Sequence, residues 1–215
     1  MVKRFVKFCA VCAAIFFASS IAVVIFYRFA PVRYTPLMLI RKHQAFSQGE
    51  RLTLRQEWVP IEYISPDIIE AVIEAEDARF YEHGGFSYND MLDAFYRNRR
   101  MGCIVAGGST ISQQTAKNVF CTPARTYTRK LFEAYFTVLI ELFWGKERIM
   151  EVYLNVIELG YGLFGVEAVA QEYYGTTALR LNYRSARALA SIIPCPVYYD
   201  PNEPSGWNNA LTNWE

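Results

Sequence analysis

The feature that most constrains this chain is an uncharged run of twenty residues near its N-terminus, from Phe8 to Tyr27. A helix of about 20 apolar residues is long enough to cross a bilayer. Because Lys3, Arg4 and Lys7 precede the run, we expect the N-terminus to lie in the cytoplasm. Everything after about residue 30 would then lie outside it. Cations on the other side of the run reduce this bias, namely Arg28, Arg33, Arg41 and Lys42.

A cleavable signal peptide is the alternative reading of the same run, since Ala18, Ser19 and Ser20 are small residues of the kind found near a cleavage site. Apolar residues continue without a break from Ile21 to Phe26, which favours an uncleaved, single-pass anchor. We therefore expect the N-terminus and anchor over residues 1–30, a membrane-proximal connection over 31–57 and one folded domain over 58–215.

Net charge and cysteine spacing argue against a nucleic-acid-binding surface, a zinc site and a dense disulfide framework. The formal net charge of +1 gives no support for a nucleic-acid-binding surface. The five cysteines match neither a zinc spacing nor a dense disulfide framework. Buried thiols are the expectation, and a Cys103–Cys121 disulfide remains an alternative outside the cytoplasm.

The patterns beyond residue 64 predict a mainly α domain. Ser65 is a good N-cap and Pro66 suits the first position of a helix. Further helices are expected over residues 87–99, 110–118, 128–144 and 146–159, from the glycine cluster at 160–165 to Gly175, and over 185–193. The helix over 128–144 is apolar nearly all the way round, so we expect it to be the central buried helix.

Glu76 is the first candidate for chemistry. It falls on the stripe that Ile69, Val72 and Ile73 would bury in the helix after Ser65. Burial would raise the pKa of this carboxyl towards that of a useful base. Taken alone, this short stretch fits a Glu that turns to solvent at a helix end better.

The second candidate is the segment from Gly107 to Asn118. Two glycines before a helix leave backbone N–H groups free to face an anion. Ser109, Gln113 and Lys117 follow at successive i, i+4 positions, so they would line one face. The spacing is not that of a Walker A loop, which excludes a nucleotide-hydrolase reading. A glycine turn followed by a solvent-facing polar helix is an equally good interpretation.

The third candidate is the cation cluster of Arg125, Arg129 and Lys130 at the start of the next helix, where the helix dipole disfavours positive charge. Glu133 could compensate it through an i, i+4 ion pair, and an anionic ligand could do so as well. Glu133 lies among aromatic residues on a helix expected to be buried, which favours a functional carboxylate.

Two carboxylates beside a cation cluster suit one reaction class. A carboxylate can take a proton from a sugar hydroxyl while cations stabilise a departing diphosphate. A glycoside hydrolase also uses two carboxylates, but its sugar leaving group needs protonation by an acid. The cations therefore favour glycosyl transfer from a diphosphate donor over hydrolysis.

The motifs themselves resemble those of the family 51 peptidoglycan glycosyltransferases. They occur in the family's order as EDARFYEHGG at 76–85, GGSTISQQTAKN at 107–118, RKLFE at 129–133, KERIMEVYLN at 146–155, GVEAVAQEYYG at 165–175 and RALASIIP at 187–194. The resemblance covers about residues 58 to 204. It implies a mainly α fold with a lysozyme-like head and a smaller membrane-proximal jaw.

The resemblance also implies an activity: polymerisation of lipid II into β-1,4-linked glycan strands, with inversion and release of undecaprenyl diphosphate, at the outer face of the cytoplasmic (inner) membrane. The implied partners are lipid II, the growing glycan strand, the bilayer and proteins of cell-wall synthesis or division. No tightly bound cofactor is implied, although a divalent cation (Mg²⁺ or Mn²⁺) at the donor diphosphate is a further expectation.

By the same resemblance, Glu76 is the general base and Glu133 the second essential carboxylate. The residues expected to bind donor diphosphate and sugars are Ser109, Gln113, Gln114, Lys117, Arg125 and Arg129. Structural roles are expected for the remaining motif residues Asp77, Phe80, His83, Gly85 and Asn118.

Two rival functions use the same fold. A peptidoglycan-cleaving enzyme would need no diphosphate site, so the cations of the second and third motifs argue against it. A non-catalytic, membrane-anchored scaffold for wall assembly would not need Glu76 and Glu133, both of which are present.

Overall fold

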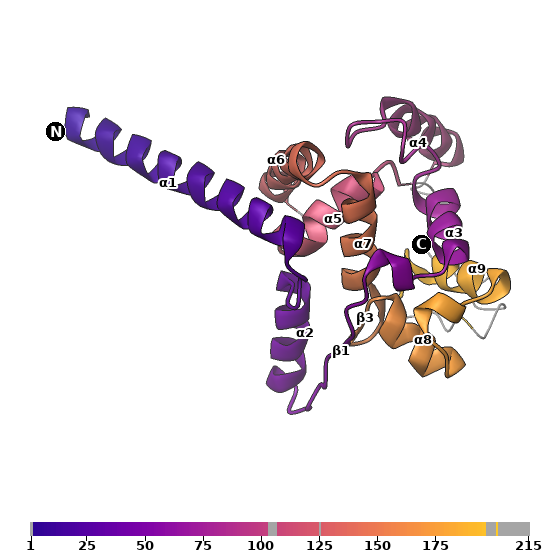
Figure 1. The fold of residues 1–215 in the computed structure, drawn as a ribbon. Coiled ribbons are helices and arrows are strands. Elements are labelled where there is room, and N and C mark those ends of the chain that lie inside the picture. Colours follow the sequence, from indigo (N-terminus) through magenta and orange to yellow (C-terminus); the bar gives the residue numbers. More distant parts are fainter. Residues whose placement is uncertain (1, 103–106, 125, 197–200, 202–215) are drawn as a thin grey trace.

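A computed structural model describes residues 2–102, 107–124, 126–196 and Pro201, and it shows a helical body from which one long helix projects (Figure 1). The projecting helix α1 covers Val2–Phe29 and has a mean hydropathy of 2.6 over its most apolar 18-residue window. It is long and apolar enough to cross a membrane, as a membrane anchor or a signal sequence would be.

The C-terminal half of α1 is fastened to the body. The indole Nε1 of Trp144 donates to the carbonyl oxygen of Val24 over 2.7 Å. The guanidinium of Arg148 donates to the carbonyl oxygens of Tyr27 and Ala30, which lie at and just beyond the end of the helix. The bonds from Arg148 satisfy carbonyls at the helix end, where intrahelical partners are missing. The helix therefore meets the body in a defined orientation.

The segment after α1 packs on the same body. Thr35 caps α2 (Pro36–Ser47), and Arg41 on this helix forms a two-pronged ion pair with Glu158, each bond 2.8 Å long. Strand β1 (Arg55–Gln56) then pairs in parallel with β3 (Leu163–Phe164). Contacts thus cross the predicted boundary at residue 57, and the position of that boundary stays a prediction.

The predicted helices beyond residue 64 are confirmed, with shifts of a few residues at their ends. They are α3 (Pro66–Glu76), α4 (Tyr88–Met101), α5 (Ile111–Phe120), α6 (Tyr127–Phe143), α7 (Lys146–Val156), α8 (Val166–Tyr174) and α9 (Tyr183–Ile192). The structure also has two short 3-10 turns that were not predicted, η1 (Ile61–Tyr63) and η2 (Ala178–Arg180). Ser65 accepts from the backbone of Asp67, and Ser87 from that of Asp90, as N-caps should. The mainly α fold class is confirmed.

The prediction of a helix running to residue 159 is wrong at its end. The chain leaves α7 at Ile157 and forms β2 (Glu158–Gly160), which pairs antiparallel with β3 to give a sheet of order β1-β3-β2. Strands of two or three residues are too short to carry an alternating pattern. Gly165 follows with φ +80°, and a Cβ there would lie 2.7 Å from the carbonyl oxygen of Asn155, so only glycine fits.

The prediction that the helix over 128–144 is the central buried one is also wrong. On α6, Leu131 is 74% exposed and Leu142 is 71% exposed. The central position belongs to α7, on which every residue from Val152 to Val156 is buried. The outer face of α6 instead adjoins α1, where Phe16 makes ring contacts with Phe132 and Tyr135 at centroid distances of 5.8 Å.

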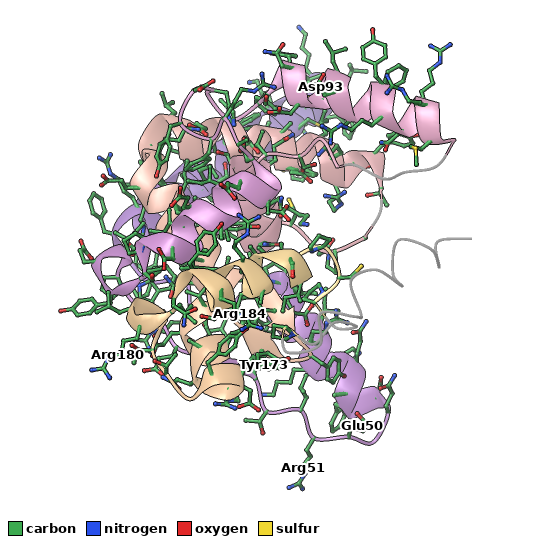
Figure 2. All side chains as sticks on the ribbon, turned by 90° about the vertical axis from the view of Figure 1, so that its right-hand side faces the viewer. Glu50, Arg51, Asp93, Tyr173, Arg180 and Arg184 are labelled. Carbon is green, nitrogen blue, oxygen red and sulfur yellow. The ribbon has the colours of Figure 1, made fainter. Side chains whose placement is uncertain are left out.

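Figure 2 shows how far the body extends. Asp93 on α4 marks one end, and Glu50 and Arg51, which follow α2, mark the other. Helices α3, α5 and α7 lie between these ends, and α8 and α9 lie on the side away from α1 (Figure 1). Helix α3 ends at Glu76, and α5 carries Gln113, Gln114, Lys117 and Asn118.

Candidate active site

The loop after α3 is tied to the start of α5 by buried polar contacts. Both carboxylate oxygens of Asp77 lie 3.0 Å from Nε2 of His83, and one of them accepts from the backbone N–H of Ile111. The other ring nitrogen of His83 accepts from the backbone N–H of Gly85. Thr110, the N-cap of α5, donates to the carbonyl oxygen of Gly85 over 2.7 Å. The first two motifs are therefore held together as one unit.

Phe80 is completely buried beneath this loop. The ammonium of Lys146 lies 4.5 Å from the centroid of its ring, within the range of a cation–π contact. Asn118 is half-buried on α5. The buried Phe80 side chain thus anchors the loop after α3 to the core.

Glu76 is the last residue of α3 and is half-buried. Of the predicted stripe, Val72 is buried, while Ile69 and Ile73 are half-buried and pack against the core. The carboxylate accepts a 2.6 Å hydrogen bond from the side-chain amide of Gln114. Burial raises the pKa of Glu76, the bond from Gln114 and the charge of Lys117 oppose that rise, and the charge of Asp77 adds to it.

The expectation that Ser109, Gln113 and Lys117 share one helix face is wrong. Helix α5 begins at Ile111 after its cap Thr110, so Ser109 precedes the helix. Gln113 is buried, and its side-chain oxygen accepts from the backbone N–H of Thr110 while the Thr110 hydroxyl accepts from the backbone N–H of Gln113. This reciprocal capping box uses the Gln113 side chain to start the helix.

Lys117 interacts electrostatically with both candidate carboxylates. Burial lowers its pKa, and the charge of Glu133 opposes this effect most strongly. Arg129 and Lys130 lower the pKa further, whereas Glu76 raises it. The ammonium is therefore within electrostatic reach of Glu76 on α3 and of Glu133 on α6 at the same time.

Glu133 is only 2% exposed on α6. One of its oxygens accepts from Arg129 over 2.5 Å, and the other accepts from the ammonium of Lys130. Lys130 also donates to the hydroxyl of Ser109, which links α6 to the segment before α5. The predicted i, i+4 ion pair thus exists with its carboxylate buried. Arg125, the remaining predicted cation, lies outside the described residues.

Cys121 lies close to the same charges at the end of α5. It is 7% exposed, and burial raises the pKa of its thiol to about 11, so it is neutral at physiological pH. Cys103, its predicted alternative partner, lies outside the described residues.

Metal binding finds no support in the side chains that surround the two carboxylates. Within the described residues, no group of three or more His, Cys, Asp or Glu could hold a metal ion. Both oxygens of Glu133 are already bonded to cationic side chains. These donors do not fit a metal site built by the protein alone.

Two residues near the site were given no binding or catalytic role by the sequence. Lys130 was recognised only as part of a cation cluster. Tyr153 on α7 is completely buried, and its hydroxyl donates to the side-chain oxygen of Gln114. A buried tyrosine needs a partner for its hydroxyl, but the sequence placed the buried helix at 128–144 and so gave no signal for Tyr153.

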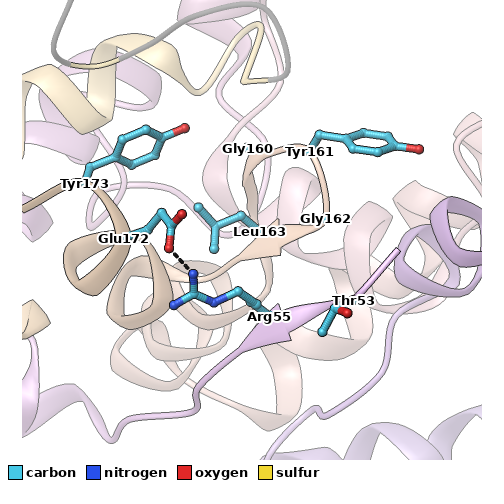
Figure 3. Close-up of a pocket in the computed structure, with 8 residues that line it drawn as sticks. All are labelled: Thr53, Arg55, Gly160, Tyr161, Gly162, Leu163, Glu172 and Tyr173. Atoms are coloured by element: carbon cyan, nitrogen blue, oxygen red, sulfur yellow. Dashed lines mark hydrogen bonds and ion pairs between the residues drawn. The ribbon is translucent and has the colours of Figure 1, made fainter. Parts of the chain in front are cut away.

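A surface pocket of about 200 Å³ lies elsewhere, between the β2–β3 hairpin, β1 and α8 (Figure 3). Gly160 and Gly162 line it, and Arg55 and Glu172 form an ion pair across it. None of the predicted site residues that the structure describes lines this pocket. It is separate from the carboxylates on α3 and α6.

Comparison with known proteins gives a family match over most of the chain. A family model described as Transglycosylase matches residues 43–214. Proteins named biosynthetic peptidoglycan transglycosylase are similar to it in sequence. The one from Bacteroides thetaiotaomicron is 45% identical over 96% of this chain and 83% of its own length. Those from Bdellovibrio bacteriovorus and Caulobacter vibrioides are 47% and 49% identical, over 90% and 87% of this chain and 77% and 79% of their own lengths.

Proposed function

The chain belongs to the transglycosylase family and polymerises the glycan strands of peptidoglycan, and we propose that Glu76 is the general base of that reaction. One observation carries the assignment. Glu76 is a partly desolvated carboxylate that a hydrogen bond from Gln114 orients, with the ammonium of Lys117 in reach. Burial raises the pKa of such a carboxyl towards that of a useful base. The ammonium of Lys117 supplies positive charge of the kind that stabilises a departing diphosphate.

In the proposed reaction, Glu76 takes the proton from the 4-hydroxyl of the acceptor N-acetylglucosamine. The freed oxygen attacks the anomeric carbon of the terminal sugar of the growing chain from the face opposite the diphosphate. The new β-1,4 bond forms as the bond to the diphosphate oxygen breaks, so the configuration inverts. Undecaprenyl diphosphate leaves with the bonding electron pair.

The leaving diphosphate is stabilised by cations. Lys117, Arg129 and Lys130 converge near Glu133, and Arg125 is proposed to join them. Glu133 holds Arg129 and Lys130 in place, and it is the second essential carboxylate because removing it would leave these cations without their fixed partner. Ser109 and Gln114 contribute further polar contacts. Because the side-chain oxygen of Gln113 accepts a hydrogen bond in the N-terminal cap of α5, we assign Gln113 a structural role there and not a substrate contact.

A divalent cation at the donor diphosphate remains a prediction. It would be held mainly by the diphosphate oxygens, since both oxygens of Glu133 are engaged. Partners among the proteins of cell-wall synthesis or division also remain predictions.

We further propose that α6 belongs to the membrane-proximal jaw and that α1 is a single-pass anchor with its N-terminus in the cytoplasm, which leaves the catalytic domain on the outer face. Phe16 and Phe17, near the middle of α1, contact Tyr135 on α6. If α1 crosses the bilayer, the exposed apolar residues Leu131 and Leu142 of α6 would face lipid. The diphosphate of a lipid-linked substrate would then arrive beside Glu133.

A depth measurement tests this placement. A fluorophore attached through Leu142→Cys in vesicles is expected to be quenched by brominated lipid chains, whereas one attached through Arg180→Cys, on the side away from α1, is not. Equal quenching at both positions would remove the proposal for α6.

The polymerisation reaction is assayed with purified protein, lipid II in detergent and, separately, preformed glycan strands. Strand formation from lipid II with no loss of preformed strands is expected. Cleavage of preformed strands would favour the lytic rival, and neither activity would favour the scaffold.

A further inference from the structure

Tyr153 is a buried polar group that the proposed reaction does not use. It lies in the middle of α7 with none of its surface exposed. Its hydroxyl donates to Oε1 of Gln114 over 3.2 Å. Burial holds the pKa of Tyr153 well above its usual range, so the hydroxyl keeps its proton at neutral pH.

Gln114 connects this hydroxyl to Glu76. Its Oε1 accepts from Tyr153, and its Nε2 donates to Oε2 of Glu76 over 2.6 Å. The chain of bonds runs from α7 through α5 to α3 and joins a fully buried tyrosine to the end of the helix that carries the base. The two ends of an amide differ in kind, since one only accepts and the other only donates.

We propose that Tyr153 is a positioning residue for the base: acting through Gln114, it keeps the donor end of the amide turned towards Glu76 and so favours the ionised carboxylate. This inference rests on the proposed role of Glu76. It assigns to Gln114 the orientation of the base, in addition to any contact with substrate.

The physical reason lies in the alternative orientation of the amide. If the amide turned round, Oε1 would face the carboxylate, and two acceptors would meet without a proton between them. That orientation suits only a protonated Glu76, which could donate to Oε1. A hydroxyl that donates to Oε1 from the other side holds this oxygen away from Glu76, and hydrogen bonding to the charged form then stabilises that form.

The other charged groups around Glu76 would not change with Tyr153. Asp77 follows it on the chain, and Lys117 faces it from α5. Helix α9 packs against α3, but its Arg187 pairs with Glu74, over 2.6 Å. A shift in the titration of Glu76 on removal of the Tyr153 hydroxyl would therefore report on the Gln114 amide.

The test is the pH dependence of kcat/KM for lipid II polymerisation by full-length Tyr153→Phe. The variant keeps the ring and loses the hydroxyl. We expect the acid limb to move to higher pH by about 0.5 to 1 unit, so that the rate on that limb falls roughly 3- to 10-fold and recovers at higher pH. A purely structural defect would lower the rate by the same factor at every pH.

Two further variants sharpen the result. Tyr135→Phe also removes a hydrogen-bonded tyrosine hydroxyl, the partner of Ser20, and should leave the acid limb in place. Gln114→Leu should move the limb in the same direction as Tyr153→Phe, and adding Tyr153→Phe to it should move the limb no further. If Tyr153→Phe does not fold, the limb of Gln114→Leu carries the test.

An unmoved limb in Tyr153→Phe or in Gln114→Leu, or a full additional shift in the double variant, would overturn the proposal. Its failure is distinguishable from failure of the base assignment. Loss of activity in Glu76→Gln together with an unmoved limb in Tyr153→Phe would refute only the role of Tyr153.

Discussion

The hydroxyl of Thr110 donates a 2.7 Å hydrogen bond to the carbonyl oxygen of Gly85 and so joins the cap of α5 to the loop that follows Glu76. Gly85 has φ +94°, and a Cβ there would lie 2.8 Å from Cγ2 of Thr137 on α6. The first two motifs and helix α6 thus meet at one glycine. Its backbone conformation and its surroundings both exclude a side chain.

Gly85→Ala is therefore expected to lower the free energy of unfolding by about 1 to 3 kcal/mol, through backbone strain and the clash with Thr137. Chemical denaturation in detergent measures this change. Gly84→Ala is the matched control, because a Cβ at that position would meet no atom within 4 Å and the φ of Gly84 is not positive. Equal stability of the two variants would contradict the close approach at Gly85.

Lys117→Met is expected to reduce kcat by about 100-fold or more, because a preorganised charge at the leaving diphosphate is lost. Steady-state kinetics with lipid II measure the effect. Lys42→Met removes an exposed ammonium from α2 and should leave kcat within a few-fold of the wild type. Similar kinetics for both variants would show that Lys117 does not act on the leaving group.

The raised pKa of Glu76 makes a prediction about stability. Between the pKa of the unfolded chain and the higher pKa of the native state, the native state binds more protons, so this carboxyl lowers the stability of the fold as pH rises through that window. Glu76→Gln removes the titrating group. The variant should be more stable than the wild type at neutral pH, and the difference should shrink towards zero at acidic pH, below the pKa of the unfolded chain.

Thermal unfolding of both proteins at neutral and acidic pH checks this sign. A variant that is less stable than the wild type at neutral pH would show that the carboxylate of Glu76 is favourably solvated or paired in the native state.

Much of the fold could be predicted because its helix boundaries are local. Ser65 and Ser87 are capping residues, and Gly165 and Gly175 flank α8, so short stretches of sequence carry the information. The family motifs carried the candidate residues. The three-stranded sheet was missed because β1 and β3 are two-residue strands that lie more than 100 residues apart.

The wrong or missing predictions at the site concern tertiary contacts, which a short stretch of sequence does not reveal. The apolar circumference of α6 is typical of a buried helix, yet one face adjoins α1 and stays exposed in Leu131 and Leu142. The spacing of Gln113 placed it on a polar face, but its side chain completes a capping box. The bond between Tyr153 and Gln114 joins residues 39 apart in sequence, so only the packing of α7 against α5 shows it.

The central claim is that Glu76 is the base, and polymerisation of lipid II by Glu76→Gln tests it most directly. Glu74→Gln is the control, since Glu74 is an exposed residue of the same helix that pairs with Arg187. We predict that Glu76→Gln loses about 10²- to 10⁴-fold in kcat while still binding lipid II, and that Glu74→Gln polymerises normally. Undiminished glycan product from Glu76→Gln would contradict the account.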